Sequence, residues 1–208
     1  ALRAALETRL GEGNVDGLSR RRDGLDLCDE ARIAALIGAL DPGYDLIIIA
    51  TGALTAGPDT PEKSIKHVSV DSLTKQFQIN AMGPALVLKH AVRLLPKGRR
   101  AVVAVLSARV GSIGDNRLGG WYGYRASKAA LNQLVRSFAI EIGRSHPQSI
   151  VVALHPGTVA TRFTSDYQSR HDTVSPKVAA SNLLAVIDGV EAGNSGQFYD
   201  YAGREVPW

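Results

Sequence analysis

Short apolar runs that alternate with helical patterns are the feature that most constrains this sequence. The runs at 45–50, 101–107 and 149–155 are rich in Val, Ile and Leu and are too short for helices. They lack the alternation of a half-exposed strand, which is typical of parallel strands covered on both faces. The other predicted strands are 15–19, 196–200 and, as a short additional candidate, 25–27.

Helical periodicity fills the segments between these runs. Ser175 and Pro176 are a typical N-cap and first-turn pair, whereas Gly83–Pro84 predicts a kink or a break inside its helix. Because strand and helix alternate throughout, we expect a doubly wound parallel α/β sheet of the Rossmann type with right-handed crossovers. No repeat or linker interrupts the pattern, which indicates one domain over residues 1–208. The predicted helices are 1–10, 29–40, 70–95, 124–144 and 176–190.

The chain opens at an unusual point for such a fold. A doubly wound nucleotide-binding sheet normally begins with a strand, a Gly-rich turn and then a helix. Here residues 1–10 already have the helical pattern, and Gly11 and Gly13 follow it, so these glycines belong to the turn into the next strand. We therefore expect a Rossmann-type domain that is truncated at its N-terminus and lacks the first strand and its phosphate-binding turn.

Composition argues against several classes of protein. No run reaches the ~18 consecutive apolar residues of a membrane span, and residues 1–10 lack a secretory signal. Cys28 is the single cysteine and has no metal-ligand motif around it, so we expect a cytoplasmic protein with neither a disulfide nor a metal site. The net charge of +4 and the Arg20–Arg22 cluster fit either a nucleic acid or an anionic small molecule.

Tyr124 and Lys128 carry the clearest chemical signal. They lie four residues apart in a predicted helix, so their side chains share one face. A free tyrosine has a pKa near ~10, and a neighbouring ammonium lowers it by favouring the phenolate. Such a pair can act as a general acid that protonates the oxygen of a carbonyl under reduction. The spacing by itself also fits a surface pair on an amphipathic helix, so other motifs must decide.

Three short motifs help to decide between these interpretations. Residues 124–130 read Tyr-Arg-Ala-Ser-Lys-Ala-Ala, Asn80 lies within Gln-Ile-Asn-Ala-Met, and His-Pro-Gly at 155–157 follows a predicted strand. On these motifs the chain, from about residue 14 to its C-terminus, resembles the classical short-chain dehydrogenase/reductase family, in particular its compact carbonyl reductases of the C-signal and sniffer type. The Asn-Asn-Ala-Gly motif of that family is replaced by Ala-Thr-Gly-Ala at 50–53.

The resemblance implies a catalytic set and a reaction. Tyr124 is the implied general acid. Lys128 lowers the pKa of that tyrosine and holds the nicotinamide ribose, and Asn80 holds a water that links the lysine to solvent. The implied reaction is hydride transfer between a nicotinamide cofactor and a small ketone or aldehyde, or the reverse oxidation of the matching alcohol.

The serine that binds the substrate oxygen in this family is harder to place. If Gly111 sets the register, the family's serine position falls on Ala108. Ser107 is our preferred candidate for the role, and Ser112 is the second. The alternative for Ser107 is a hydroxyl that caps the end of a strand.

The same resemblance assigns the cofactor contacts. An acid at the end of the strand 15–19 would bind a ribose 2′-hydroxyl, whereas an arginine accommodates a 2′-phosphate. Ser19 and Arg20 stand at that place, and a guanidinium pairs well with phosphate, so we predict NADP(H) rather than NAD(H). The other implied contacts are Asp26 and Leu27 beside the adenine, Ala50, Thr51 and Gly52 after a strand, Tyr124 and Lys128 at the ribose, and Pro156, Gly157, Val159 and Thr161 around the nicotinamide.

The segment 161–175, where the family builds its substrate lid, is short and polar here. It predicts an open pocket for small carbonyl substrates, and Trp121, Tyr122 and Phe163 either line that pocket or pack as ordinary aromatics. The resemblance also implies a homodimer or homotetramer formed through the helices of the catalytic asparagine and tyrosine, with no nucleic-acid or membrane partner. The rival hypotheses are a protein of the same fold that has lost cofactor binding and acts in binding or signalling, and nucleic-acid binding through Arg20–Arg22.

Overall fold

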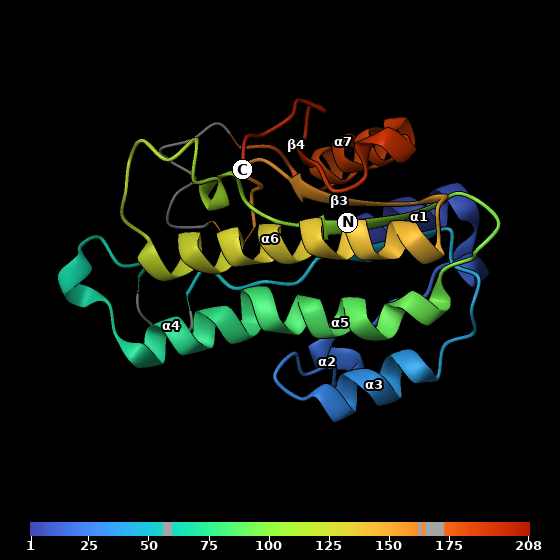
Figure 1. The fold of residues 1–208 in the computed structure, drawn as a ribbon, viewed down its shortest axis with the longest axis horizontal. Helices are drawn as coiled ribbons and strands as arrows, with labels where there is room; N and C mark the ends of the chain where they lie inside the picture. Colours follow the sequence, from blue (N-terminus) through green and yellow to red (C-terminus); the bar gives the residue numbers. More distant parts are fainter. Residues whose placement is uncertain (56–59, 162–163, 165–172) are drawn as a thin grey trace.

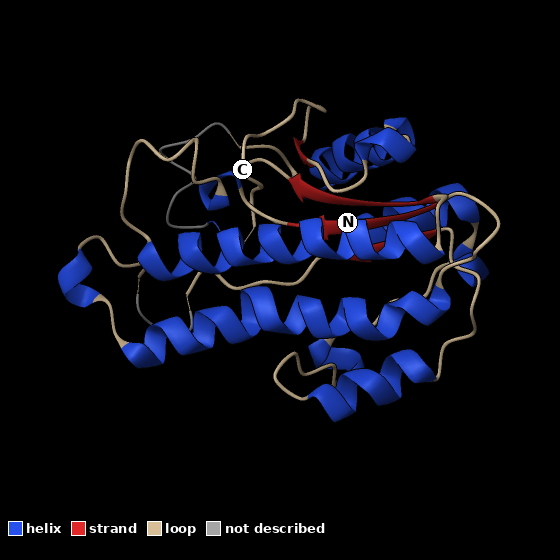
Figure 2. Cartoon of the chain, in the orientation of Figure 1, coloured by secondary structure: helices blue, strands red, loops and turns tan. Residues whose placement is uncertain are grey.

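The computed structural model describes residues 1–55, 60–161, 164 and 173–208. Within these residues, four parallel strands form one sheet in the order β1-β2-β3-β4. Helices lie on both faces of the sheet (Figure 1, Figure 2), which confirms the predicted doubly wound α/β fold. The strands are β1 (Leu46–Ile49), β2 (Ala101–Leu106), β3 (Ser149–His155) and β4 (Phe198–Asp200).

Seven α-helices accompany the sheet in the described part of the chain. The side chain of Ser175 accepts a hydrogen bond from the Val178 amide, as predicted for the N-cap of the last helix. Of the helices that the structure describes, none is long and apolar enough to cross a membrane. The helices are α1 (Leu2–Leu10), α2 (Arg20–Asp23), α3 (Glu30–Gly38), α4 (Val70–Phe77), α5 (Gly83–Ala91), α6 (Tyr122–Ser145) and α7 (Pro176–Gly189).

Two apolar layers hold the sheet between its helices. On one face, Val103 of β2 and its partner Val151 of β3 pack against α5 and α6. On the other face, Val102 and its partner Ile150 pack against α7 and α1. Burial of both faces explains why these strands are apolar at almost every position.

The helical segment predicted over 70–95 is continuous at Gly83–Pro84, but its backbone hydrogen-bond pattern changes there. A π-helical turn, Gln78–Met82, joins α4 to α5. Pro84 has no N–H to donate to the Asn80 carbonyl four residues earlier, so the α-helical pattern is interrupted at this point. Asn80 therefore lies inside a π turn, a local widening of the helix that is frequent at functional sites.

The predicted strands 15–19 and 25–27 do not form. Ser19 instead caps α2, and its hydroxyl accepts a hydrogen bond from the Arg22 amide at 3.2 Å. Leu25 is buried in a cluster with α3 rather than in the sheet. An apolar run becomes a strand only where a neighbouring strand supplies backbone hydrogen-bond partners. The residues of the run do not show whether such a neighbour exists.

Candidate active site

The predicted site residues gather at one end of the sheet. Ala50, Ser107 and Pro156 directly follow β1, β2 and β3. Because the three strands are parallel, these residues share the end toward which the β3 arrow points in Figure 1. This is the edge at which open α/β sheets bind ligands.

Asn80 and Lys128 converge on Gly52 at this end of the sheet. A Cβ added at Gly52 would lie 3.2 Å from Asn80 Oδ1 and 3.3 Å from Lys128 Nζ. The turn after β1, the π turn and α6 therefore meet around one glycine. Any side chain at this position would crowd both polar groups.

Tyr124 and Lys128 are both buried, with 6% and 3% of their surfaces exposed. The Lys128 ammonium donates a hydrogen bond to the Leu106 carbonyl at 3.0 Å. Gly111 packs closely against the turn of α6 that carries Lys128, since a Cβ added at Gly111 would lie 2.7 Å from Lys128 Cβ. The predicted common face of the tyrosine and the lysine is thus turned inward, and a surface pair is excluded.

Burial controls the protonation of this pair. It raises the pKa of Tyr124 above its ordinary value and lowers the pKa of Lys128 to about 8. A low-dielectric surrounding disfavours the charged form of both groups. Burial therefore acts against the lowering of the tyrosine pKa that we expect from the neighbouring ammonium, and that lowering stays a prediction.

Asn80 is fully buried and joins the turn after β1 to α6. Its Oδ1 accepts from the Ala53 amide at 2.8 Å, and its Nδ2 lies 2.8 Å from the Ala53 carbonyl oxygen. The same Nδ2 lies 2.6 Å from Gln76 Oε1 and 3.2 Å from Ser127 Oγ. The Ser127 hydroxyl in turn donates to the Tyr124 carbonyl at 2.9 Å. A continuous set of hydrogen bonds thus connects the π turn with the helix of the tyrosine.

The two candidate serines make different contacts. The Ser107 hydroxyl donates to Asn132 Oδ1 at 2.6 Å, and both side chains are buried. The Ser112 hydroxyl donates to the Pro207 carbonyl and accepts from the Asp115 amide at 3.0 Å, so it ties its loop to the end of the chain. Contact of Ser107 with a substrate stays a prediction. To donate to a substrate carbonyl, the Ser107 hydroxyl must first give up its hydrogen bond to Asn132.

The turn after β1 offers a polar group that a ligand can satisfy. Thr51 Oγ1 is buried and has no hydrogen-bond partner among the described residues. An unsatisfied buried hydroxyl costs free energy unless a ligand or water binds it. Together with the close approach at Gly52, this hydroxyl fits the predicted contact with a nicotinamide cofactor.

The Pro156–Gly157 turn lies against the last segment of the chain. Gly157 has a φ of 77° and lies so close to Tyr201 that a Cβ added there would be 2.9 Å from the tyrosine Cδ1. Burial lowers the pKa of the preceding His155 to about 4, so a neutral imidazole borders the motif. Val159 pairs with Val174 in an isolated bridge, which holds the backbone that leads to Thr161. Residues 162, 163 and 165–172 of the predicted lid, Phe163 included, lie outside the described residues.

The predicted 2′-phosphate site has an exposed arginine and a serine that is already bonded. The Ser19 hydroxyl accepts from the Arg22 amide and donates to Asp23 at 3.0 Å. Arg20 begins α2 and is exposed. Asp26 and Leu27 follow in a turn, where Asp26 accepts from the Cys28 amide at 2.9 Å and Leu27 packs against Gly83.

Two buried polar residues escaped the sequence analysis. Gln76 binds Asn80 and also donates to the Leu54 carbonyl at 2.8 Å, and Asn132 binds Ser107. Each lies one helical turn from a predicted site residue, Gln76 before Asn80 and Asn132 after Lys128. A polar residue at that spacing on the buried face was the signal that could have identified them.

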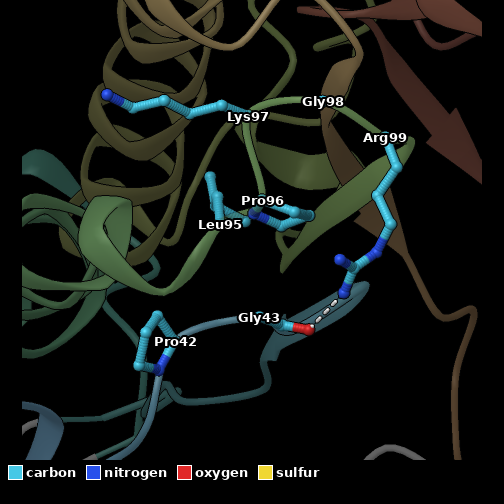
Figure 3. Close-up of a pocket in the computed structure, with 7 residues that line it drawn as sticks. All are labelled: Pro42, Gly43, Leu95, Pro96, Lys97, Gly98 and Arg99. Atoms are coloured by element: carbon cyan, nitrogen blue, oxygen red, sulfur yellow. Dashed lines mark hydrogen bonds between the residues drawn. The ribbon is translucent and has the colours of Figure 1, made fainter.

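A cavity of about 520 Å³ lies at the opposite end of the sheet. Gly43 and Arg99, which line it, precede β1 and β2, and the Arg99 guanidinium donates to the Gly43 carbonyl at 2.8 Å (Figure 3). The Lys97 side chain points away from this hydrogen bond. None of the predicted site residues lines this cavity, so it is separate from the candidate active site.

Sequence comparison places the chain among known enzymes. A family model described as "Enoyl-(Acyl carrier protein) reductase" matches residues 16–195. The 1-hydroxy-2-glutathionyl-2-methyl-3-butene dehydrogenase of Rhodococcus sp. (strain AD45) is 32% identical over 198 residues, which cover 88% of this chain and 86% of that protein. C-signal of Myxococcus xanthus is 39% identical over 146 residues, which cover 70% of this chain and 84% of that protein.

Structural comparison leads to the same group. A short-chain dehydrogenase/reductase from Burkholderia multivorans, solved with bound NADP, superposes with a TM-score of 0.75 at 30% identity, covering 88% of this chain and 75% of that chain. The carbonyl reductase Sniffer of D. melanogaster superposes with a TM-score of 0.75 at 25% identity, covering 88% of this chain and 76% of that chain. The likeness therefore holds both in sequence and in three-dimensional structure.

Proposed function

The chain belongs to the short-chain dehydrogenase/reductase family, and from that premise we propose that it is an NADP(H)-dependent oxidoreductase that reduces a small ketone or aldehyde or oxidises the matching alcohol. One observation carries the proposal. Tyr124 and Lys128 are buried at the carboxyl end of the parallel strands, and Asn80 meets the lysine around Gly52. A buried phenol, an ammonium and an amide side chain near the edge where such sheets bind nucleotides support the proposal.

Several residues of this chain would hold the cofactor. Thr51 would contact the adenosine half, and Lys128 would hold the nicotinamide ribose. The backbone at Val159 and the Thr161 hydroxyl would bind the carboxamide. A bound NADPH supplies the hydride for the reduction. The preference for NADP(H) is supported by the exposed Arg20 and by the Burkholderia relative that was solved with NADP.

Tyr124 is the proposed proton donor. Because burial raises its pKa, the phenol keeps its proton at neutral pH and its O–H can donate to the carbonyl oxygen as negative charge develops there. Lys128, with a pKa of about 8, is mostly protonated at pH 7 and stabilises the phenolate that remains after the transfer. Asn80 fixes the relative positions of the turn after β1 and α6 through its hydrogen bonds. Ser107 is the proposed second contact of the substrate oxygen.

Titration of the protein with NADPH, and separately with NADH, tests the proposal directly. Trp121 and Trp208 supply the intrinsic fluorescence that reports binding. We expect micromolar affinity for NADPH and a clear weakening in Arg20→Ala. Small aldehydes and ketones are then screened by NADPH consumption, with Tyr124→Phe as the inactive control.

The two remaining outcomes separate the rival functions. A folded protein that binds neither cofactor would refute the enzyme proposal and support a binding or signalling role. Binding of NADH in preference to NADPH would refute only the proposed role of Arg20.

We also propose that the protein forms a homodimer or homotetramer through α4, α5 and α6. Light scattering after size exclusion tests this, with an expected mass of twice or four times the 22.1 kDa of the chain. A mass equal to that of one chain refutes it.

A further inference from the structure

The start of α6, three residues before Tyr124, has an unusual backbone conformation. Trp121 has a φ of 51° and is the one non-glycine residue with a positive φ in the described part of the chain. Bulky residues adopt this left-handed conformation only where their surroundings hold them in it. The contacts around Trp121 therefore determine how α6 begins.

Glu62 contacts this region through both its backbone and its side chain. Its backbone carbonyl accepts a hydrogen bond from the Trp121 amide at 2.6 Å. Its carboxylate accepts from the Gly123 amide at 3.2 Å and from the Ser72 hydroxyl of α4 at 2.8 Å. Glu62 is only 9% exposed, so one buried acid joins the beginning of α6 to the neighbouring helix α4, which lies beside it (Figure 1).

Sequence and charge both fit this arrangement. A Cβ added at Gly123 would lie 3.0 Å from Glu62 Oε1, so the glycine leaves room for the carboxylate. A negative charge at the N-terminus of a 24-residue helix is stabilised by the helix dipole. Burial works against the charge of Glu62, but its hydrogen bonds, including those from Ser72 and Gly123, outweigh it and lower the pKa of the acid.

The same residues contact the proposed proton donor. The Trp121 ring packs edge-to-face on the Tyr124 ring, with ring centroids 6.3 Å apart and an interplanar angle of 65°. Tyr124 is the third residue of α6, so its side chain moves with the turn that Glu62 holds. Glu62 is thus linked to the phenol through Trp121 and Gly123.

We propose that Glu62 is a positioning residue for Tyr124, which it holds by fixing the first turn of α6 and the indole that packs on the phenol. This inference rests on the proposed function, in which Tyr124 is the proton donor. It assigns Glu62 no contact with substrate or cofactor. Its effect should therefore appear in the rate of the chemical step rather than in binding.

The test compares Glu62→Ala and Glu62→Gln with Glu141→Ala, an exposed acid on the same helix. We expect Glu62→Ala to lower kcat about tenfold or more, because small misplacements of reacting groups are costly. The KM for the carbonyl and the Kd for NADPH should stay within about twofold. Glu62→Gln should recover most of kcat, since its amide oxygen still accepts from Gly123, and Glu141→Ala should match the wild type. An unchanged kcat in folded Glu62→Ala overturns the proposal, as does a loss of NADPH affinity as large as the loss of kcat.

Hydrogen exchange separates this inference from the proposed function. In the cofactor-free protein, Glu62→Ala should raise the amide exchange of residues 121–125 by about tenfold, and Glu141→Ala should not. If the wild type reduces no carbonyl yet this exchange rises, the proposed function fails and the structural link through Glu62 holds. If exchange is unchanged, the link is refuted whatever the activity. Should Glu62→Ala not fold, Ser72→Ala removes one donor to the carboxylate and is expected to shift exchange and kcat in the same directions; no shift in either overturns the proposal.

Discussion

Gly111 offers a sharp test of how rigidly the protein holds Lys128. A Cβ added at Gly111 would stand 2.7 Å from Lys128 Cβ and 2.9 Å from the Lys128 carbonyl carbon, whereas ordinary contacts begin at 3.4 Å. Gly111→Ala must therefore separate the two segments by about 0.7 Å, the shortfall from 3.4 to 2.7 Å. Neither contacted atom is the end of a flexible side chain, and the φ of Gly111 is not positive, so steric overlap is the only penalty. Overpacking of this kind costs about 1–3 kcal/mol.

The same displacement reaches the site. Misplacement by ~1 Å costs on the order of 100-fold in rate, so we expect kcat/KM for Gly111→Ala to fall about tenfold or more. At this chain length the melting temperature should fall by about 2–4 °C for each kcal/mol lost. Urea unfolding and NADPH consumption measure the two effects in one preparation.

Gly143→Ala is the matched control for this substitution. It makes the same change within α6, where nothing lies within 4 Å of the added Cβ. We expect it to stabilise the protein by about 0.5–1 kcal/mol, because alanine favours the helix more than glycine does. If Gly111→Ala is as stable and as active as the wild type, the turn Arg109–Gly111 after β2 shifts at little cost, and the argument that this turn fixes Lys128 is refuted.

Three further substitutions test individual contacts. Burial lowers the pKa of Lys128 from 10.5 to about 8, so between these values the unfolded chain binds the extra proton and the free energy of unfolding rises with pH. Lys128→Met should abolish this rise in urea titrations at about pH 8 and 10; an equal pH dependence in both proteins would contradict the assignment. Asn132→Leu leaves the buried Ser107 hydroxyl without its acceptor and should cost about 1–3 kcal/mol in the same assay, whereas unchanged stability would show that the hydroxyl finds another partner. Thr51→Val removes a buried hydroxyl that has no partner among the described residues, so it should stabilise the cofactor-free protein by about 1 kcal/mol and weaken NADPH binding several-fold. Full NADPH affinity in Thr51→Val would exclude that hydroxyl from the cofactor site.

Sequence patterns correctly predicted strands that are buried on both faces and helix ends that depend only on nearby residues. The runs at 101–107 and 149–155 became β2 and β3, because strands covered on both faces are apolar almost throughout. The Ser175 cap was also predictable, since a cap depends on residues three positions apart. The run at 15–19 failed as a strand, because strand formation needs a partner that the run itself does not contain.

The sequence by itself determined the fold class and the shared face of Tyr124 and Lys128, because strand order and helical spacing are properties of the chain read in one dimension. Only the tertiary structure decided which partner each polar group binds. It directed Ser107 to Asn132 and brought Glu62 to the start of α6. It also raised the pKa of the Tyr124 phenol through burial, because a low-dielectric surrounding disfavours the charged phenolate. These outcomes depend on segments that are distant in sequence and on the dielectric they create when they pack together.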